Sequence, residues 1–420
     1  MDLRKSMRCQ RDDVALSITK HLFSKEEYQE KNMVFSPFSL HIVLSVMAAG
    51  SQGHTLHELL SFLRSDSTDH LNTLFSQLVS AVATPSHCLS YVNGIWADKS
   101  VSLSHTFKQL VATHYKATLH STDFTKADQV CHEVNSWVER ETSGLITELC
   151  PSKVVANLTS LVYASALCFK GVWKHKFDAL STYHADFHLL NGTSIKLPFM
   201  TSKKKTQYIR AFDGFKILRL PYKQDSDKKR RFSMCIFLPD AKDGLSALIE
   251  KLASESGFLK GKLPRRKVQV IRFGIPKFKI SFTLEASNVL KELGVVSPFS
   301  QWDADFTKMV DSPSNGVYVE SMFHTTSIDV NEEGTEATAL ELMFARLKCR
   351  TRNPSINFVA NHPFLFMIRE DLTGTILFIG KVLHPDGEAS SLKATLEMEE
   401  FFRSAKKRRS FFKEQWGIIY

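Results

Sequence analysis

The chain has 420 residues, of which 43% are hydrophobic, and its 54 Lys and Arg against 44 Asp and Glu leave a net charge of +10. This composition is typical of globular proteins, and the low counts of 18 Gly and 13 Pro exclude collagen-like and low-complexity chains. No apolar run approaches the roughly 18 residues of a membrane-spanning helix. No Gly/Ser/Pro-rich linker occurs between residues 12 and 385, so we expect one large folded body followed by a tail.

The start of the chain is polar and lacks the apolar core of a secretory signal, which predicts an intracellular protein. We expect a cytoplasmic location and disfavour an extracellular one. A nucleocytoplasmic distribution is the alternative, because Lys406–Arg409 resembles a minimal nuclear-import signal. The cysteines are scattered, odd in number and without a CxxC pair, so we expect reduced thiols rather than a disulfide framework or a zinc cluster. They are Cys9, Cys88, Cys131, Cys150, Cys168, Cys235 and Cys349.

Helical signals come first along the chain. Residues 14–23 and 130–148 carry apolar side chains at helical spacing, which predicts an amphipathic helix in each. Between them, Ser36 is a suitable N-cap, Pro37 suits the first helical position, and Gly50 follows an apolar stretch. We therefore expect a buried helix that starts after Ser36 and ends at Gly50.

A capping-box pattern, Thr55 followed by Glu58, predicts another helix start. Beyond it the pattern changes, because several segments are rich in β-branched and aromatic residues and are bounded by turn signals such as Asn191–Gly192 and Asp213–Gly214. The strands expected are 158–170, 208–220, 232–238, 268–283 and 356–382, the last including a hairpin of 364–368 with 376–382. Helices followed by strands predict an α+β fold.

Motifs for catalysis are missing. No GxSxG, HExxH, GxxxxGK[ST] or GxGxxG pattern occurs, so we expect no enzyme, no cofactor and no metal site. Two SxxK matches, Ser226–Lys229 and Ser410–Lys413, are short enough to arise by chance. His54 and His57 share a helix face, but no third ligand accompanies them, so we interpret them as a surface pair.

Three basic clusters, Lys203–Lys205, Lys228–Arg231 and Arg265–Lys267, are candidates for contact with a polyanion. Solvated loops between strands are the favoured alternative. Aromatic residues are not interleaved with the charges and no nucleic-acid-binding signature is present, so a nucleic-acid partner is disfavoured.

The segment Ile328–Ala339 joins an acidic turn containing one glycine to a run of small residues. Downstream lie a basic stretch, Ala345–Arg352, and the strand-like Phe358–Phe366. In this series the chain resembles the serpins, and particularly the plant (Z-type) serpins. The resemblance spans about residues 12–385 and includes Asn32–Ser39, Asn135–Val138 with Thr142 and Gly144, Phe169–Trp173, Leu197–Met200, Pro276–Ile280 and the terminal hairpin.

The resemblance implies a serpin domain over residues 1–385, with helices around three β-sheets and an exposed reactive-centre loop at about residues 332–357. Residues 386–420 form a C-terminal extension without a counterpart in the family. A serpin is a protease inhibitor rather than an enzyme: the protease attacks the loop and becomes an acyl-enzyme, and the cleaved loop then inserts as a new strand into the large sheet. The implied hinge is Glu332, Glu333, Gly334, Thr335, Glu336, Ala337, Thr338 and Ala339.

Counting in the family's register from the first hinge glutamate places Lys348 before the cleaved bond, Lys348–Cys349. Its neighbours are Leu347 and the alternative bait residues Arg346 and Arg350. A basic bait implies a target endopeptidase that prefers Lys or Arg, either a trypsin-like serine protease or a metacaspase-like cysteine protease. We expect the protein to be a monomer without a membrane partner.

Two positions depart from the family pattern. Period-two alternation places Glu341 on the inward face of the inserted strand, where an unpaired carboxylate is costly to bury. In the sheet-opening cluster implied by the resemblance, Ser36, Ser39 and His324 match, but Ser165 stands where the family has asparagine. The shorter hydroxyl predicts a weaker or water-bridged cluster. Both departures favour the alternative of a non-inhibitory serpin, a substrate or binding scaffold.

Overall fold

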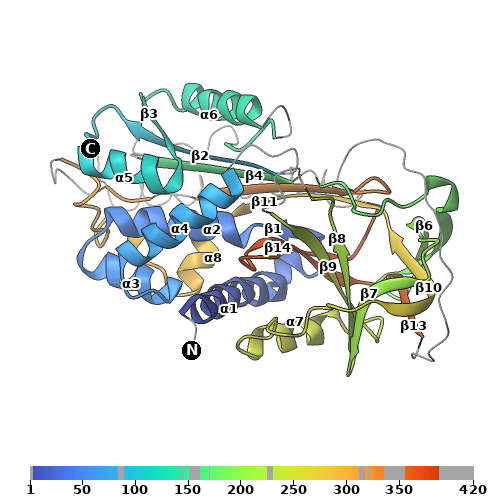
Figure 1. Cartoon of the computed structure of the whole chain (residues 1–420). Helices are drawn as coiled ribbons and strands as arrows, with labels where there is room; N and C mark the ends of the chain where they lie inside the picture. Colours follow the sequence, from blue (N-terminus) through green and yellow to red (C-terminus); the bar gives the residue numbers. More distant parts are fainter. Residues whose placement is uncertain are drawn as a thin grey trace.

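The computed structural model describes residues 3–83, 89–142, 144, 146–150, 161–169, 171–224, 230–311, 317–319, 322–334 and 355–386. Helices fill most of the early part and strands most of the later part, which confirms the predicted α+β class (Figure 1). The helices are α1 (Leu3–Ser24), α2 (Pro37–Gly50), α3 (Gly53–Leu63), α4 (Thr68–Ala83), α5 (His105–Tyr115), α6 (Ala127–Glu141), α7 (Leu245–Ser254) and α8 (Ala286–Glu292), with short 3-10 helices η1 (Glu26–Tyr28), η2 (Ala179–Ser181) and η3 (Ser297–Phe299). The strands are β1 (Met33–Phe35), β2 (Leu89–Asp98), β3 (Thr118–Thr122), β4 (Leu161–Phe169), β5 (Tyr183–His188), β6 (Ser194–Met200), β7 (Thr206–Phe212), β8 (Phe215–Pro221), β9 (Phe232–Pro239), β10 (Val268–Pro276), β11 (Phe278–Glu285), β12 (Phe323–Val330), β13 (Ile356–Val359), β14 (Phe364–Glu370) and β15 (Ile376–Val382).

The described strands form three sheets. The largest has ten strands in the order β1-β15-β14-β9-β8-β7-β10-β6-β5, with β13 paired to β10. A second sheet has the order β3-β2-β4, and β11 and β12 form an antiparallel pair. Strand β12 also lies alongside β4, so the two small sheets are neighbours.

Helices cover both faces of the β3-β2-β4 sheet. Figure 1 shows α6 on one face, with α2, α4 and α5 on the other. Side chains under α6 form a core cluster of their own, in which Trp96 and Trp137 meet edge to face with ring centroids 4.9 Å apart. The larger core lies on the opposite face and extends through α1 and α2 into the ten-stranded sheet. None of the described helices has the length and apolar character needed to cross a bilayer.

The predicted helix after Ser36 is confirmed. Helix α2 runs from Pro37 to Gly50, and the Ser36 side chain caps it by accepting a hydrogen bond from the backbone N–H of Ser39. All its residues are buried, which explains why its sequence is apolar on every side. This burial holds the start of α2 in a defined place between the sheets.

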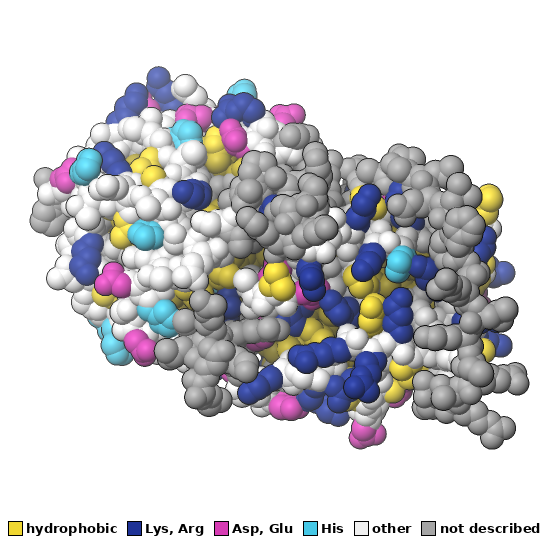
Figure 2. Space-filling model, viewed as in Figure 1, with side chains coloured by type: hydrophobic (Ala, Val, Ile, Leu, Met, Phe, Trp, Pro, Cys, Tyr) yellow, Lys and Arg dark blue, Asp and Glu magenta, His cyan; other side chains and the backbone are white. Residues whose placement is uncertain are grey.

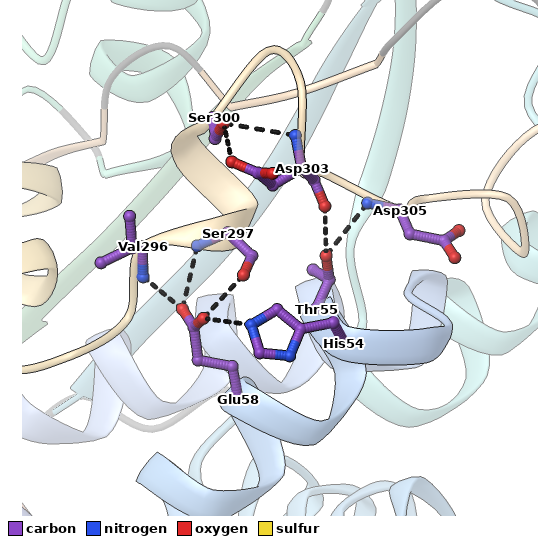
Figure 3. A network of polar contacts seen from close by, with 8 residues as sticks. All are labelled: His54, Thr55, Glu58, Val296, Ser297, Ser300, Asp303 and Asp305. Carbon is purple, nitrogen blue, oxygen red and sulfur yellow. Dashed lines mark hydrogen bonds and ion pairs between the residues drawn. The ribbon is translucent and has the colours of Figure 1, made fainter.

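The capping-box prediction is wrong, because α3 starts at Gly53 and Thr55 lies inside the helix. Thr55 instead donates a hydrogen bond to the carbonyl of Asp303 and accepts one from the N–H of Asp305 (Figure 3). Glu58 accepts hydrogen bonds from the N–H and the hydroxyl of Ser297. Both side chains therefore tie α3 to a segment more than two hundred residues away, rather than capping it.

The helix expected over 130–148 ends earlier, at Glu141. The Thr142 hydroxyl donates to the carbonyl of Val138 at 2.6 Å and accepts from the N–H of Ile146 at 3.1 Å. These contacts stop the helix and turn the chain back along α6.

The predicted turns lie between paired strands: Asn191–Gly192 between β5 and β6, and Asp213–Gly214 between β7 and β8. The terminal hairpin of β14 and β15 is also confirmed. The strand expected over 268–283 is broken at Lys277 into β10 and β11, which belong to different sheets. Sequence patterns missed β1, β2, β3, β5, β6 and β12, whose burial patterns or short lengths conceal the alternation.

Candidate functional site

Strands β4 and β12 define a seam between two sheets. In the part of the chain that the structure describes, β4 pairs with β2 and β12 pairs with β11, while β4 and β12 lie next to each other in separate sheets. Both run toward the same end, because Val172, just after β4, forms a bridge with Gly334, just after β12. A segment that turned back from Gly334 would therefore be antiparallel to both strands. No pairing joins β4 to β12 in the described residues, so the facing backbone groups of these strands are where a further strand would pair.

All four of the predicted sheet-opening residues form hydrogen bonds at the base of this seam. The N–H of Ser36 donates to Nε2 of His324 at 2.9 Å, which joins α2 to β12. The hydroxyls of Ser39 and Ser165 lie 2.8 Å apart, which joins α2 to β4. The sequence predicts a weaker or water-bridged cluster at Ser165; in the structure its hydroxyl reaches Ser39 directly. One helix start thus contacts both strands that border the seam.

All members of this cluster are buried. Because Nε2 of His324 accepts a hydrogen bond from a backbone N–H, this nitrogen carries no proton in the native state. Burial lowers the pKa of His324 from 6.5 to about 4, since a charged imidazole would lose its hydration. The cluster therefore depends on a neutral histidine.

This dependence predicts a loss of stability in mild acid. The unfolded state binds a proton on His324 below pH 6.5, whereas the native state resists protonation down to about pH 4. The stabilisation is complete above the unfolded pKa and is lost as the pH falls between these values, by about 2 kcal/mol from pH 7.5 to pH 5.0. Urea unfolding at these two pH values measures it.

The control for this prediction is His324→Gln, which keeps an acceptor for the N–H of Ser36 but does not titrate. Burial also lowers the pKa of His41 to about 4, so this variant should retain the part of the pH dependence that His41 contributes. If the free energy of unfolding of His324→Gln fell between pH 7.5 and pH 5.0 by as much as that of the wild type, the assignment to His324 would be contradicted.

The first hinge residues are anchored at the other end of the seam. The backbone N–H groups of Trp173 and Phe177 donate to the carbonyls of Glu333 and Glu332, each at 3.0 Å. The Trp173 indole donates to the carbonyl of Asn331 at 2.9 Å. These bonds hold the start of the hinge against the segment that follows β4.

The side chains of the two hinge glutamates are also held. Glu332 accepts a hydrogen bond from the Thr182 hydroxyl at 2.8 Å and pairs with Lys277 at 3.1 Å. Burial opposes its ionisation, but the hydrogen bond from Thr182, a backbone hydrogen bond and the contact with Lys277 together outweigh burial and keep the pKa of Glu332 below its ordinary value. Glu333 forms an ion pair with Lys176. The anchor therefore combines backbone hydrogen bonds with charged contacts.

Gly334 fits this site because it has no side chain. Its φ is +136°, and a Cβ added there would lie 2.1 Å from the carbonyl oxygen of Gly171 and 2.6 Å from Cα of Val172. No rotamer relieves such a clash with backbone atoms. Only glycine allows the hinge to approach the end of β4 this closely.

We expect Gly334→Ala to lower the free energy of unfolding by a few kcal/mol, because it adds a backbone clash to an unfavourable φ. Gly192→Ala is the matched control: its φ is +84° and nothing lies within 4 Å of the added Cβ, so its loss should be only about 1 kcal/mol. Urea unfolding of both variants measures the difference. Equal losses would show that the contact with Gly171 does not matter.

Several predicted site residues lie outside the described residues. These are Thr335, Glu336, Ala337, Thr338 and Ala339 of the hinge, the bond Lys348–Cys349, the bait neighbours Arg346, Leu347 and Arg350, and Glu341. The same holds for the extension after residue 386 and for both SxxK matches. Their roles stay predictions.

The structure adds residues that the sequence did not single out. Trp173 and Lys277 lie in segments that carry the family resemblance, Phe169–Trp173 and Pro276–Ile280, so the sequence could have indicated that they belong to the site. Thr182 and Lys176 had no such signal, because their role follows from contacts with glutamates about 150 residues away.

Basic side chains gather on another part of the surface. Figure 2 shows Lys and Arg in the lower right of the view, over the region where Figure 1 places α7 and β7. Among the described basic residues, Lys262 pairs with Glu255 at 2.5 Å and lies 3.8 Å from the centroid of the Phe258 ring, and Lys203 pairs with Asp178 at 2.5 Å. These contacts favour a solvated basic face, and a polyanion partner stays a prediction.

Comparisons with known proteins agree with the architecture. A family model described as Serpin (serine protease inhibitor) matches residues 10–385. Serpin-ZX of Arabidopsis thaliana is 48% identical over 394 residues, which cover 92% of this chain and 100% of that protein. Serpin-ZXA of Oryza sativa subsp. japonica is 48% identical over 363 residues, which cover 84% of this chain and 90% of that protein.

Solved structures show the same similarity. Arabidopsis AtSerpin1 in its native stressed conformation has a TM-score of 0.83 and 47% identity, and the match covers 92% of this chain and 99% of that one. Cleaved Serpin 42Da has a TM-score of 0.77 and 30% identity, with 90% and 99% covered.

Proposed function

This chain belongs to the serpin family, and on that basis we propose that it inhibits endopeptidases that cleave after Lys or Arg, by trapping them after cleavage at Lys348–Cys349. Trypsin-like serine proteases are the proposed targets, and metacaspase-like cysteine proteases are a second class with the same preference. The protein acts as bait and trap, and turns over no substrate of its own.

The observation that carries the proposal is the seam between β4 and β12. A sheet left in two halves, with both bordering strands running toward the hinge, can gain a strand from the segment that starts at Gly334. Successive residues of the added strand form backbone hydrogen bonds with β4 and β12 in alternation, which supplies the driving force for insertion. The anchor at Glu332 and Glu333 sets where this segment begins.

The cluster of Ser36, Ser39, Ser165 and His324 supports a role in sheet opening. An entering strand must part β4 from β12, and both strands are hydrogen-bonded to the start of α2 at the base of the seam. Breaking these bonds leaves buried polar groups without partners, which costs about 1–3 kcal/mol for each group. The cluster therefore resists premature opening.

Incubation of the purified protein with trypsin tests the proposal. We expect a complex that survives denaturing electrophoresis, together with a small released peptide whose N-terminus is Cys349. Trypsin whose active-site serine is replaced by alanine is the control, since it binds the loop but forms no acyl-enzyme. Cleavage at this bond without a stable complex would exclude the trap.

That outcome would support a second candidate, which Glu341 favours. A carboxylate on the inward face slows insertion, and the acyl-enzyme then hydrolyses before the protease is distorted. The protein would then be a non-inhibitory serpin whose loop is a substrate or a binding segment.

A further inference from the structure

Two cysteines that are 19 positions apart in the sequence meet beneath α6. Cys131 lies in α6 and Cys150 lies beyond its end, and their sulfur atoms are 2.7 Å apart. Both side chains are buried, with 3% and 4% of their surface exposed, and the structure holds them as thiols. Cys235, the third free and buried cysteine among the described residues, lies elsewhere, in β9. A small movement would bring the two sulfur atoms of the pair to the bonded separation of roughly 2.05 Å.

The backbone around the pair is already held in place by Asn135, one turn after Cys131 on α6. Its Nδ2 donates to the carbonyl of Cys150 at 2.8 Å. Its Oδ1 accepts from the N–H groups of Leu149 and Cys150, each at 2.8 Å. These three hydrogen bonds fix the segment of Cys150 against α6, so joining the sulfur atoms requires little further ordering of the chain.

Cys131 and Cys150 lie under a helix that packs against β4, one of the two strands that border the seam. The cluster under α6 includes both cysteines and Ala164 and Ala166 of β4, so α6 packs on the outer face of a strand that borders the seam (Figure 1). A strand that enters beside β4 presents alternate side chains toward this same face. Helix α6 and the segment after it must yield to make room for those side chains.

We propose that Cys131 and Cys150 are a redox-responsive pair whose disulfide ties α6 to the segment leading toward β4 and slows strand insertion. The formation of the bond depends only on this geometry, whereas its effect on inhibition rests on the proposed function. Oxidation would make the protein a slower inhibitor, and reduction would restore its rate.

With hydrogen peroxide as the oxidant, the chemistry is a two-electron oxidation. One cysteine loses its proton and attacks the peroxide as a thiolate; the O–O bond breaks, the hydroxide released takes up that proton as water, and a sulfenic acid is left. The second sulfur then attacks the sulfenic sulfur, and the S–OH oxygen leaves with the second thiol's proton as another water while the S–S bond forms. A dithiol reductant reverses the reaction by two exchange steps. The neighbouring Cys131 thiol and burial raise the pKa of the Cys150 thiol, so the pair reacts slowly and responds to sustained oxidation rather than to brief exposure.

Peptide mapping by mass spectrometry tests whether the bond forms. After peroxide treatment of the full chain we expect a linked peptide pair containing Cys131 and Cys150, two hydrogens lighter than the separate peptides and released by dithiothreitol. Cys131→Ala and Cys150→Ala should give no such pair. Cys235→Ala is the matched control, because it removes a buried thiol elsewhere and should leave the link intact. Absence of the link in the wild type overturns the proposal.

The effect of the link is measured in two ways. Amide hydrogen exchange in α6 should slow several-fold in the oxidised wild type, and this readout does not depend on inhibition. The rate of complex formation with trypsin should fall several-fold in the oxidised wild type, but not in Cys131→Ala treated in the same way. An equal fall in both proteins would assign the effect to other thiols, such as Cys349, and overturn the proposed role. If no complex forms at all, the proposed function fails, while the exchange data still decide whether the disulfide restrains α6.

Discussion

Replacement of Lys348 by glutamate should reduce the rate of complex formation with trypsin by roughly a hundredfold or more. The specificity pocket of a trypsin-like protease holds a buried carboxylate, so a basic bait side chain is paired there and an acidic one is repelled. Removing one partner of a buried charge pair costs about 3–5 kcal/mol, which corresponds to about two to four powers of ten in rate. Progress curves of trypsin activity at several inhibitor concentrations measure the rate constant.

Two variants serve as controls for this prediction. Lys348→Arg keeps the positive charge and should keep most of the rate. Lys267→Glu changes the net charge by the same amount, but on an exposed side chain directly before β10. It should therefore change the rate of complex formation only modestly. If Lys348→Glu inhibited as fast as the wild type, the bait would lie elsewhere, and Arg346→Glu and Arg350→Glu would identify it.

Replacement of Glu341 by threonine should increase the fraction of trypsin that is trapped rather than released. Strand β12 has 8 residues and β4 has 9, so a segment of equal length that starts after Gly334 includes residue 341. Alternation places Glu341 on the same face as Thr335, the face that the family turns inward. Burying this carboxylate requires its protonation or the loss of its hydration, and either slows insertion. The number of inhibitor molecules consumed for each trypsin inactivated measures the effect.

Glu336→Thr is the matched control for Glu341→Thr. It removes the same charge from the opposite face of the same segment, so the ratio of trapping to cleavage should change little. If both variants improved trapping equally, the net charge of the loop rather than burial of one carboxylate would be responsible. If neither did, Ser165→Asn would be the next variant to test.

Much of the fold follows from local patterns. Helix α2 was predictable because its cap, its Pro37 and its final Gly50 all act within a few residues of the backbone groups they affect. The turns at Asn191–Gly192 and Asp213–Gly214 were predictable for the same reason. Strand β12 was not predicted, because its signals depend on neighbours from distant parts of the chain.

The resemblance to serpins located the cluster of Ser36, Ser39, Ser165 and His324, but not its contacts. That Ser165 reaches Ser39 directly depends on how close α2 packs against β4, and no side-chain length predicts that spacing. The interpretation of Thr55 and Glu58 as a capping box failed for a related reason. The side-chain oxygen atoms that could hydrogen-bond to the first N–H groups of a helix can equally bond to the backbone of a neighbouring segment. Which of the two partners they take depends on how the segments pack.

By itself, the sequence determined the α+β class, because local order and spacing along the chain set which segments form helices and strands. The hinge position and Lys348 as the bait follow from the resemblance to the serpins and stay predictions. The tertiary structure alone decided that β4 and β12 are neighbours without strand pairing among the described residues, that Lys277 and Thr182 hold Glu332, and that Cys131 and Cys150 touch. The physical reason is that hydrogen bonds, ion pairs and thiol contacts act over a few ångströms. Which residues come that close is set by how the elements pack, and residues 36 and 324 meet although 288 positions separate them.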